Sequence, residues 1–238
     1  MLDATKTVRE FAVQMPQAPR LFEKLGIDYC CGGGKSLADA CVAAKLHVDE
    51  VLHQLEVAAA PTTTNADWRN ADLADLIEHI VTKHHSYIKQ ELPRLEALIN
   101  KVASKHGPKH PELPQVQDLL AGVATELTSH LMKEEQILFP YVIDCERGTR
   151  DSQRLRPPMF GSVRNPIHMM ELEHDSAGDA LKRMREITNG FTPPEDGCMS
   201  FKALYQGLTE FEADLHEHIH LENNILFPRA IELESRGR

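Results

Sequence analysis

The sequence predicts an all-α protein, in which a four-helix bundle over residues 72–238 follows a small helical domain over residues 1–60 and a linker over residues 61–71. Three observations support this prediction. After residue 70 the apolar residues recur with helical periodicity, which three Gly- and Pro-containing breaks interrupt. A His-and-Glu pattern in one half of this region recurs in the other half. The polar segment from Pro61 to Asn65 separates it from shorter helical pieces.

Composition narrows the class of protein. Lys and Arg total 26 against 36 Asp and Glu, a formal charge of −10, and no long basic run appears, which argues against a nucleic-acid or anionic-membrane partner. No apolar stretch approaches the roughly 20 residues that span a bilayer. The N-terminus shows no basic segment leading into an apolar one, and five cysteines, two of them adjacent, do not suit a disulfide framework. We therefore expect a cytoplasmic protein.

The first 60 residues are expected to form a small helical domain around a tight loop. Helices are expected over residues 19–25, 36–46 and 48–59, and Asp39, three residues after Ser36, suggests a capping box at the second of them. Between the first two helices lies a loop whose three glycines permit backbone angles that other residues resist. It reads Tyr29-Cys30-Cys31-Gly32-Gly33-Gly34.

The breaks at residues 107–114, 147–166 and 189–197 leave four long helices, and these repeat. His130-x-x-x-Glu134 followed by Ile-Leu-Phe-Pro reappears 88 residues later as His218-x-x-x-Glu222 followed by the same four residues. His84 and His174 lie 90 residues apart and each precedes an amphipathic stretch. Each half of the bundle is therefore a helix with one His followed by a helix with His-x-x-x-Glu.

Helical phase selects which histidines face the core. His84 falls on the stripe that contains Ile77, Ile80 and Ile88, whereas His85 lies about 100° around the helix. One His in each helix and two Glu are selected in this way, while His168, His216 and His220 fall on other faces. The selected residues are His84, His130, Glu134, His174, His218 and Glu222.

Six ionisable groups in an apolar core are costly unless they are paired or bind metal. A His and a Glu four residues apart lie on one helix face and can present a nitrogen and an oxygen to the same ion. Two such pairs imply two ions bridged by Glu134 and Glu222. Four His with two Glu resemble di-iron sites more than mononuclear zinc sites. A lone His among them is more simply a hydrogen-bonded core residue, but the set indicates two non-haem irons with an oxo or hydroxo bridge.

These residues and several local motifs resemble the repair-of-iron-centres family, the group of YtfE, ScdA, DnrN and NorA, over essentially the whole chain. The resemblance implies a haemerythrin-like bundle whose ligands map onto the same six residues, and an ScdA-type N-terminal domain that contains the Cys pair. The segment over residues 147–166 is longer than the family's usual connection. The motifs are Asp28-Tyr29-Cys30-Cys31-Gly32-Gly33, Leu138-Phe139-Pro140, Glu173-His174-Asp175, Glu222-Asn223-Asn224 and Leu226-Phe227-Pro228-Arg229.

Four further residues have two interpretations. Cys30 and Cys31 could bind metal, accept nitric oxide or pass on an iron ion, because a thiolate is both ligand and nucleophile. They fit a tight turn with reduced thiols equally well. Glu126, one turn before His130, and Glu173, beside His174, could support the iron ligands or simply lie on solvated helix faces.

Two functions remain open at this point. The family resemblance implies a labile iron source that rebuilds iron–sulfur clusters damaged by nitric oxide or oxidants, with iron–sulfur proteins as partners. In the alternative, the centre binds, senses or reduces nitric oxide or dioxygen. A purely structural metal bundle would not need the Cys-Cys domain. The sequence does not assign catalytic residues, and it leaves a homodimer open.

Overall fold

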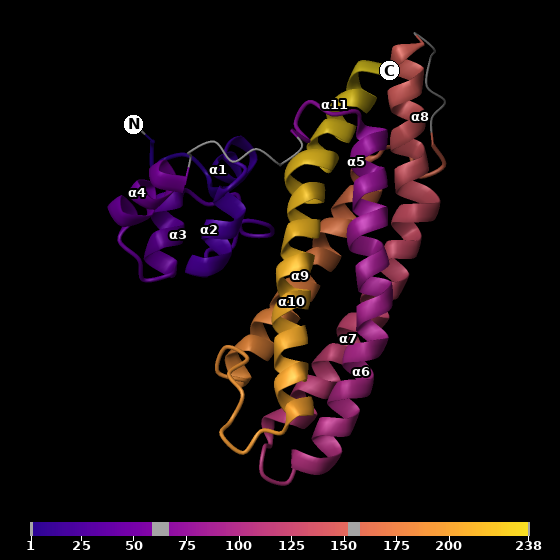
Figure 1. Cartoon of the computed structure of the whole chain (residues 1–238). Helices are drawn as coiled ribbons and strands as arrows, with labels where there is room; N and C mark the ends of the chain where they lie inside the picture. Colours follow the sequence, from indigo (N-terminus) through magenta and orange to yellow (C-terminus); the bar gives the residue numbers. More distant parts are fainter. Residues whose placement is uncertain (1, 59–66, 152–157, 238) are drawn as a thin grey trace.

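The computed structural model describes residues 2–58, 67–151 and 158–237, which form helices, turns and loops without a β-strand (Figure 1). A group of four short helices lies beside one long bundle. This arrangement confirms the all-α fold that the helical periodicity predicted. Most of the expected linker and the middle of the connection over residues 147–166 lie outside the described residues.

The N-terminal group contains one helix more than the sequence analysis expected. The first helix has only seven residues, but Thr7 and Glu10 form a capping box that fixes its start, with the Thr7 backbone N–H 2.7 Å from the Glu10 carboxylate. Ser36 caps the third helix by accepting a hydrogen bond from the Asp39 backbone at 3.1 Å, and the Asp39 carboxylate accepts from the Ser36 hydroxyl at 2.7 Å rather than from its backbone, as a full capping box would require. The four helices are α1 (Val8–Gln14), α2 (Ala18–Leu25), α3 (Leu37–Ala43) and α4 (Val48–Ala58).

Four long helices form the bundle, and three of them contain a π-helical turn. One helix is α9 (Arg164–Ile187), which is α-helical throughout. The others are continuous runs of an α-helix, a π-turn and a second α-helix. These runs are α5 (Leu73–His79), η1 (Ile80–His85) and α6 (Ser86–His106), then α7 (Glu112–Lys133), η2 (Glu134–Leu138) and α8 (Phe139–Arg150), and finally α10 (Met199–Leu221), η3 (Glu222–Leu226) and α11 (Phe227–Gly237).

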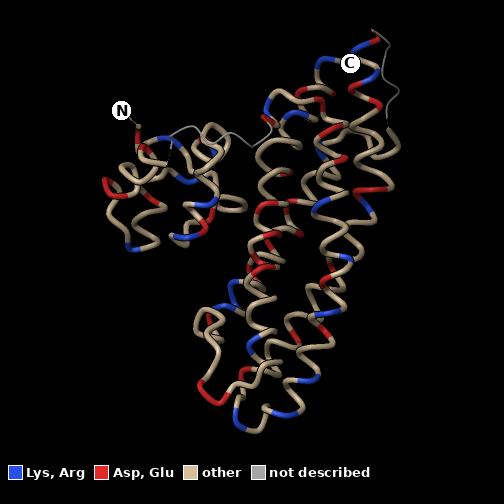
Figure 2. The backbone as a smooth tube through the Cα atoms, in the orientation of Figure 1, with Lys and Arg blue, Asp and Glu red and all other residues tan. Residues whose placement is uncertain are grey.

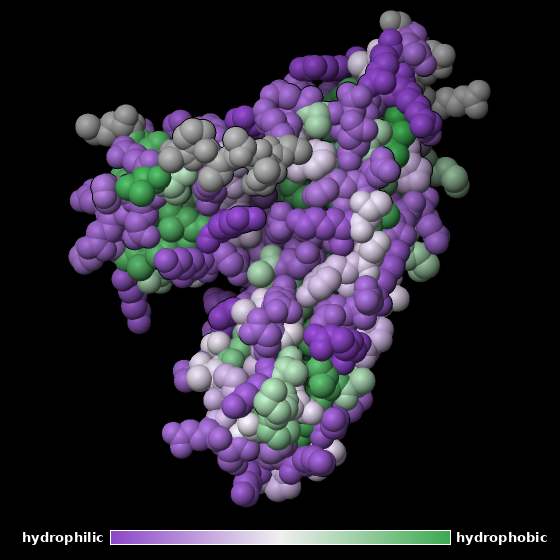
Figure 3. Space-filling model, viewed as in Figure 1, coloured by the Kyte–Doolittle hydropathy of each residue, from purple (hydrophilic) through white to green (hydrophobic). Residues whose placement is uncertain are grey.

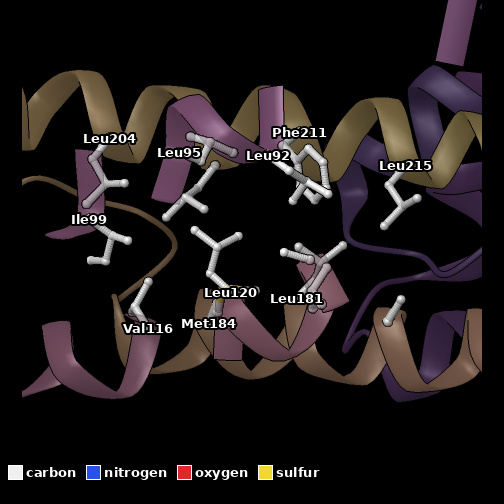
Figure 4. Packing of buried hydrophobic residues seen from close by; sticks show 14 of the residues in the cluster. Leu92, Leu95, Ile99, Val116, Leu120, Leu181, Met184, Leu204, Phe211 and Leu215 are labelled. Carbon is white, nitrogen blue, oxygen red and sulfur yellow. The ribbon is translucent and has the colours of Figure 1, made fainter. Parts of the chain in front are cut away.

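Two apolar clusters fill the bundle on either side of these π-turns. One joins α6, α7, α9 and α10, where Leu95, Leu120, Leu181 and Leu204 interdigitate (Figure 4). The other joins α5, α8, α11 and the first turns of α9. Apolar packing therefore holds the helices together above and below the level at which the His and Glu repeat places its polar side chains.

The N-terminal helices pack on the side of the bundle next to α10 (Figure 1). His216 Nδ1 lies 2.9 Å from Glu23 Oε2, and the His220 ring lies 5.5 Å from the Tyr29 ring. The sequence analysis placed both histidines on faces away from the metal ligands. The structure gives those faces a role, because they contact the N-terminal helices.

The surface is mixed in charge and mainly hydrophilic. Acidic and basic residues alternate along the bundle in Figure 2, and green apolar patches in Figure 3 are small and separated in that view. Among the residues that the structure describes, no helix combines the length and apolar character needed to cross a bilayer.

A buried carboxylate anchors the start of α9 to α11. Glu234, only 4% exposed, accepts hydrogen bonds from Tyr141 Oη at 2.8 Å, Ser162 Oγ at 2.7 Å and the Val163 backbone N–H at 3.0 Å. Three donors satisfy a charge that would otherwise be costly to bury.

We expect Glu234→Ala to lower the free energy of unfolding by about 2–4 kcal/mol, because it leaves these buried donors unpaired. Glu232→Ala, on the same helix, removes only an exposed ion pair with Arg236 and should cost less than about 1 kcal/mol. Urea unfolding followed by circular dichroism measures both. Equal losses would show that Glu234 does not anchor the connection.

Candidate metal centre

The three π-turns occur at one level of the bundle, and each places a His or Glu side chain inside. His85 ends η1, Glu134 begins η2 and Glu222 begins η3. A π-turn inserts an extra residue into a helix and shifts the residues that follow around its axis, and such turns are frequent at functional sites. The local widening therefore brings polar side chains to the bundle axis without ending any helix.

One group of potential metal donors joins α10 and all three π-turns. His85 Nε2 lies 3.2 Å from His218 Nε2 and 3.5 Å from Glu134 Oε2. His218 Nε2 lies 3.0 Å from Glu222 Oε1. All four side chains are fully buried. Nitrogens bound to one ion at about 2.1 Å stand roughly 3 Å apart, so this spacing suits a shared metal.

A second group lies beside the first and uses the same two carboxylates. His130 Nε2 lies 3.0 Å from His174 Nε2 and 3.3 Å from Glu134 Oε2, and His174 Nε2 lies 3.1 Å from Glu222 Oε2. Within each group, one donor atom per residue lies within 4.8 Å of all the others. Two imidazole pairs with two common carboxylates match the donor set of a bridged two-metal site.

The structure corrects the sequence-based placement of one histidine. His85 contacts Glu134 and His218, whereas His84 does not belong to either donor group. Uniform α-helical phase put His84 inward and His85 about 100° away, but η1 turns both rings into the bundle. His84 Nδ1 instead lies 3.0 Å from Asp214 Oδ1.

The sequence did contain a signal for this correction. His85 and His174 are 89 residues apart, closer to the 88-residue repeat of His130 and His218 than the 90 residues between His84 and His174. The other five selected residues, His130, Glu134, His174, His218 and Glu222, lie together as the sequence analysis placed them.

Three of the four histidines are oriented through the second ring nitrogen. With Nε2 directed at the donor group, Nδ1 carries the hydrogen and donates it to an oxygen acceptor, which fixes the tautomer and the ring. Glu173 is one of these acceptors, whereas Glu126 contacts Ser176 at 3.0 Å instead. The other two acceptors, Glu135 and Asn223, were missed by the sequence analysis. The bonds join His130 to Glu173 (2.8 Å), His85 to Glu135 (2.8 Å) and His174 to Asn223 (2.9 Å).

Orphaned carboxylate oxygens test whether the site fits a metal. Both oxygens of Glu134 and Oε2 of Glu222 are buried and accept no hydrogen bond from the described residues. Buried carboxylates are normally satisfied by donors, and unsatisfied ones are expensive. Positive ions between the two imidazole pairs would satisfy these oxygens, so the residues present fit a pair of metal ions.

The buried charges of the two donor groups shift the pKa values of their neighbours. Burial lowers the pKa of His130, but the carboxylates of Glu134, Glu222 and Glu173 outweigh burial and raise the pKa to about 9. Burial likewise opposes ionisation of Glu222, yet the neighbouring His218 and His174 hold its pKa well below the usual range. His130 is therefore an imidazolium near neutral pH, and Glu222 is a carboxylate.

The Cys30–Cys31 loop lies against the bundle. The Cys30 and Cys31 sulfurs are 3.9 Å apart, and both backbone N–H groups donate to Asp28 Oδ1 at 3.1 Å. Cys30 is buried and Cys31 is partly buried. The adjacent Cys31 thiol, burial and the charge of Asp28 raise the pKa of Cys30 well above its ordinary value. Cys30 is therefore a protonated thiol in this arrangement, which weakens it as a nucleophile or ligand.

The fold and this donor set define a hemerythrin-like metal-binding bundle, and comparison with known proteins agrees. Residues 76–230 match the Hemerythrin HHE cation binding domain, and residues 4–59 match the ScdA_N domain, whose function is described as unknown. Iron–sulfur cluster repair protein YtfE of Pectobacterium atrosepticum is 40% identical over 226 residues, 95% of this chain and 96% of the relative. The protein of the same name from Escherichia coli O81 is 41% identical over 93% of this chain and 94% of the relative. The chain belongs to the repair-of-iron-centres family.

The two adjacent histidines give a direct test of the corrected geometry. We expect His85→Ala to weaken iron binding at least about tenfold, because it removes a donor nitrogen from one group. His84→Ala should keep its iron, since His84 contacts Asp214 rather than the donor atoms. Iron titration of both variants with metal analysis measures the difference. Loss of iron in His84→Ala with full retention in His85→Ala would show that His84 is the ligand, as uniform α-helical phase predicted.

The raised pKa of His130 gives a prediction about pH. Below about pH 9 a metal ion must displace the His130 proton, so apparent affinity should rise with pH by up to about tenfold per unit for one displaced proton. Co²⁺ titration calorimetry between about pH 6.5 and 8, repeated in buffers with different ionisation enthalpies, counts the protons released. If the affinity does not depend on pH and no proton is released, His130 does not carry a proton that the metal must displace.

Proposed function

We propose that this chain repairs iron–sulfur clusters by donating iron from a di-iron centre. The main support is that Glu134 and Glu222 each belong to both buried donor groups, as bridging carboxylates would. The proposed ligands are His85, His130, Glu134, His174, His218 and Glu222. The proposal divides the chain into an ScdA-type domain over residues 1–60, a linker over residues 61–71 and the di-iron bundle over residues 72–238.

The donor chemistry supports iron. Imidazole nitrogens suit iron, zinc and copper, while carboxylates that bridge two ions suit harder cations, and neither group contains a thiolate. Bound there, two irons would supply a pair of ions that can change oxidation state, joined by an oxo or hydroxo bridge.

Charge balance supports donation rather than storage. Four neutral imidazoles and two carboxylates leave two ferrous ions with excess positive charge, less neutralised than in a ferritin-like set of four Glu and two His. Such a site favours the ferrous state and releases an ion more readily. The curated relatives that match nearly the whole chain are named for iron–sulfur cluster repair. Damaged or apo iron–sulfur proteins in the cytoplasm are the proposed partners.

The Cys30–Cys31 loop is the proposed route between the centre and an acceptor. Its sulfurs lie between the N-terminal helices and α9 of the bundle, and a thiolate can take up an iron ion or nitric oxide. Because Cys30 is buried with a raised pKa, transfer requires this loop to open before Cys30 ionises. Cys31, which is partly exposed, is the first candidate acceptor.

Binding or reduction of nitric oxide or dioxygen is the second candidate function. The observation that favours it is the donor count, because two imidazoles and two shared carboxylates leave coordination positions free on each ion. In this case the iron stays in place while a small molecule binds to it.

Iron transfer distinguishes the two functions. We expect Cys30→Ala with Cys31→Ala to keep its iron but to slow cluster formation on an apo iron–sulfur protein at least about tenfold, because the transfer thiols are missing. Each protein is loaded with ferrous iron and mixed with acceptor, sulfide and thiol while cluster absorbance is recorded.

Cys198→Ala is the matched control, because this thiol is exposed at the other end of α10 and should leave the rate unchanged. Equal rates for the double variant and the parent would remove the cysteine pair from delivery. A protein that retains its iron in the presence of acceptor yet consumes nitric oxide over many turnovers would replace donation with gas chemistry.

A further inference from the structure

The π-turn η3 contacts both the metal centre and the N-terminal helices through three successive buried residues. Glu222 belongs to both donor groups, and Asn223 Oδ1 lies 2.9 Å from Nδ1 of His174. Asn224 faces the other way, toward the N-terminal helices. Asn223 and Asn224 are 5% and 6% exposed. The printed hydrogen bonds involve Asn223 Oδ1 and Asn224 Nδ2, so each amide is oriented by a buried polar partner.

Asn224 uses both hydrogens of its amide. Its Nδ2 donates to the backbone carbonyl of Tyr29 at 2.9 Å and to Nδ1 of His220 at 2.8 Å. The Tyr29 ring also packs edge-on against the His220 ring. Asn224 therefore holds the backbone immediately before Cys30.

The held loop extends into the bundle. Cys30 packs in the apolar cluster that contains Ala177 and Leu181 of α9, rather than in the core of the N-terminal helices. The Cys31 sulfur lies over Gly178, 3.6 Å from where a β-carbon would be. Gly178 is one helical turn beyond His174, so the thiol pair sits one turn from a proposed iron ligand.

A cavity borders this contact between the loop and the bundle. A cavity of about 800 Å³ separates other parts of the N-terminal helices from the bundle, with Glu23 and Tyr29 on one wall and Asp214 and Glu217 on the other. The hydrogen bond between His216 and Glu23 lies on the same side of α10. That bond joins α2 to α10, whereas the Asn224 hydrogen bond joins the loop itself to η3, so losing the Asn224 bond can release the loop.

We propose that Asn224 is the positioning residue for the Cys30–Cys31 loop, which it holds closed against α9 so that Cys30 becomes reachable only when this hydrogen bond opens. Its part in iron delivery rests on the proposed function, but the test below does not. The π-turn that supplies Glu222 thus also holds the proposed transfer thiols, and the loop and the metal centre share one structural support.

The five cysteines of the full-length protein report on this proposal directly. Iron-loaded parent and Asn224→Ala proteins are exposed to N-ethylmaleimide, and alkylation of each cysteine is followed by peptide mass spectrometry. We expect Cys30 in Asn224→Ala to react at least about tenfold faster than in the parent, because the loop opens. Cys41 and Cys145, buried in the N-terminal helices and in the bundle, should not change, and the iron content and the visible spectrum of the centre should be retained.

A matched variant separates positioning from general loosening. His216→Ala removes the hydrogen bond to Glu23 and should change Cys30 alkylation by less than about twofold. An unchanged Cys30 rate in Asn224→Ala overturns the proposal. A parallel rise at Cys41 or Cys145 overturns it too, because it reports unfolding, and so does an equal rise in His216→Ala. Iron donation is measured in a separate experiment. If the proposed iron donation fails there, the alkylation rates still test the role of Asn224.

Discussion

Two buried carboxylates shared by two pairs of imidazoles are the constraint on which the rest of the structure depends. Glu134 and Glu222 lie in an apolar bundle with oxygens that no described donor satisfies. Such an arrangement is stable only when positive charge lies between them, as metal ions or as imidazolium protons. The apolar clusters above and below hold the four helices close enough for this sharing, and the outer acceptors direct the rings toward the shared space.

The π-turns show how a regular bundle accommodates that constraint. Each of three helices widens at the level of the carboxylates, so the donors reach the axis while the packing on both sides stays helical. The same device lets η3 serve two purposes, because three successive residues point to the metal centre, to a ligand histidine and to the N-terminal loop. In a regular α-helix, successive residues point about 100° apart, and a wider turn changes which of them are buried.

Much of this could be predicted from the sequence. Periodicity predicted the four helices, and the repeat of His130-x-x-x-Glu134 at His218 predicted that both carboxylates face one site, which the structure shows. His84 is buried as its helical phase predicted, but the donor groups contain His85, because η1 departs from the uniform helical phase that the prediction assumed. A π-turn is a tertiary accommodation without a clear local signal. Helix α1 and the contacts of His216 and His220 were missed for related reasons. A seven-residue helix has too few residues to show periodicity, and a contact between distant helices leaves no local pattern.

The most direct test of the central claim is Mössbauer spectroscopy joined to metal analysis of the iron-loaded protein. If Glu134 and Glu222 bridge two ions, the protein should hold about two irons per chain, and the oxidised form should show antiferromagnetically coupled, diamagnetic ferric ions at low temperature. One iron per chain, or ferric ions with the magnetic splitting of isolated centres, would contradict a shared carboxylate site.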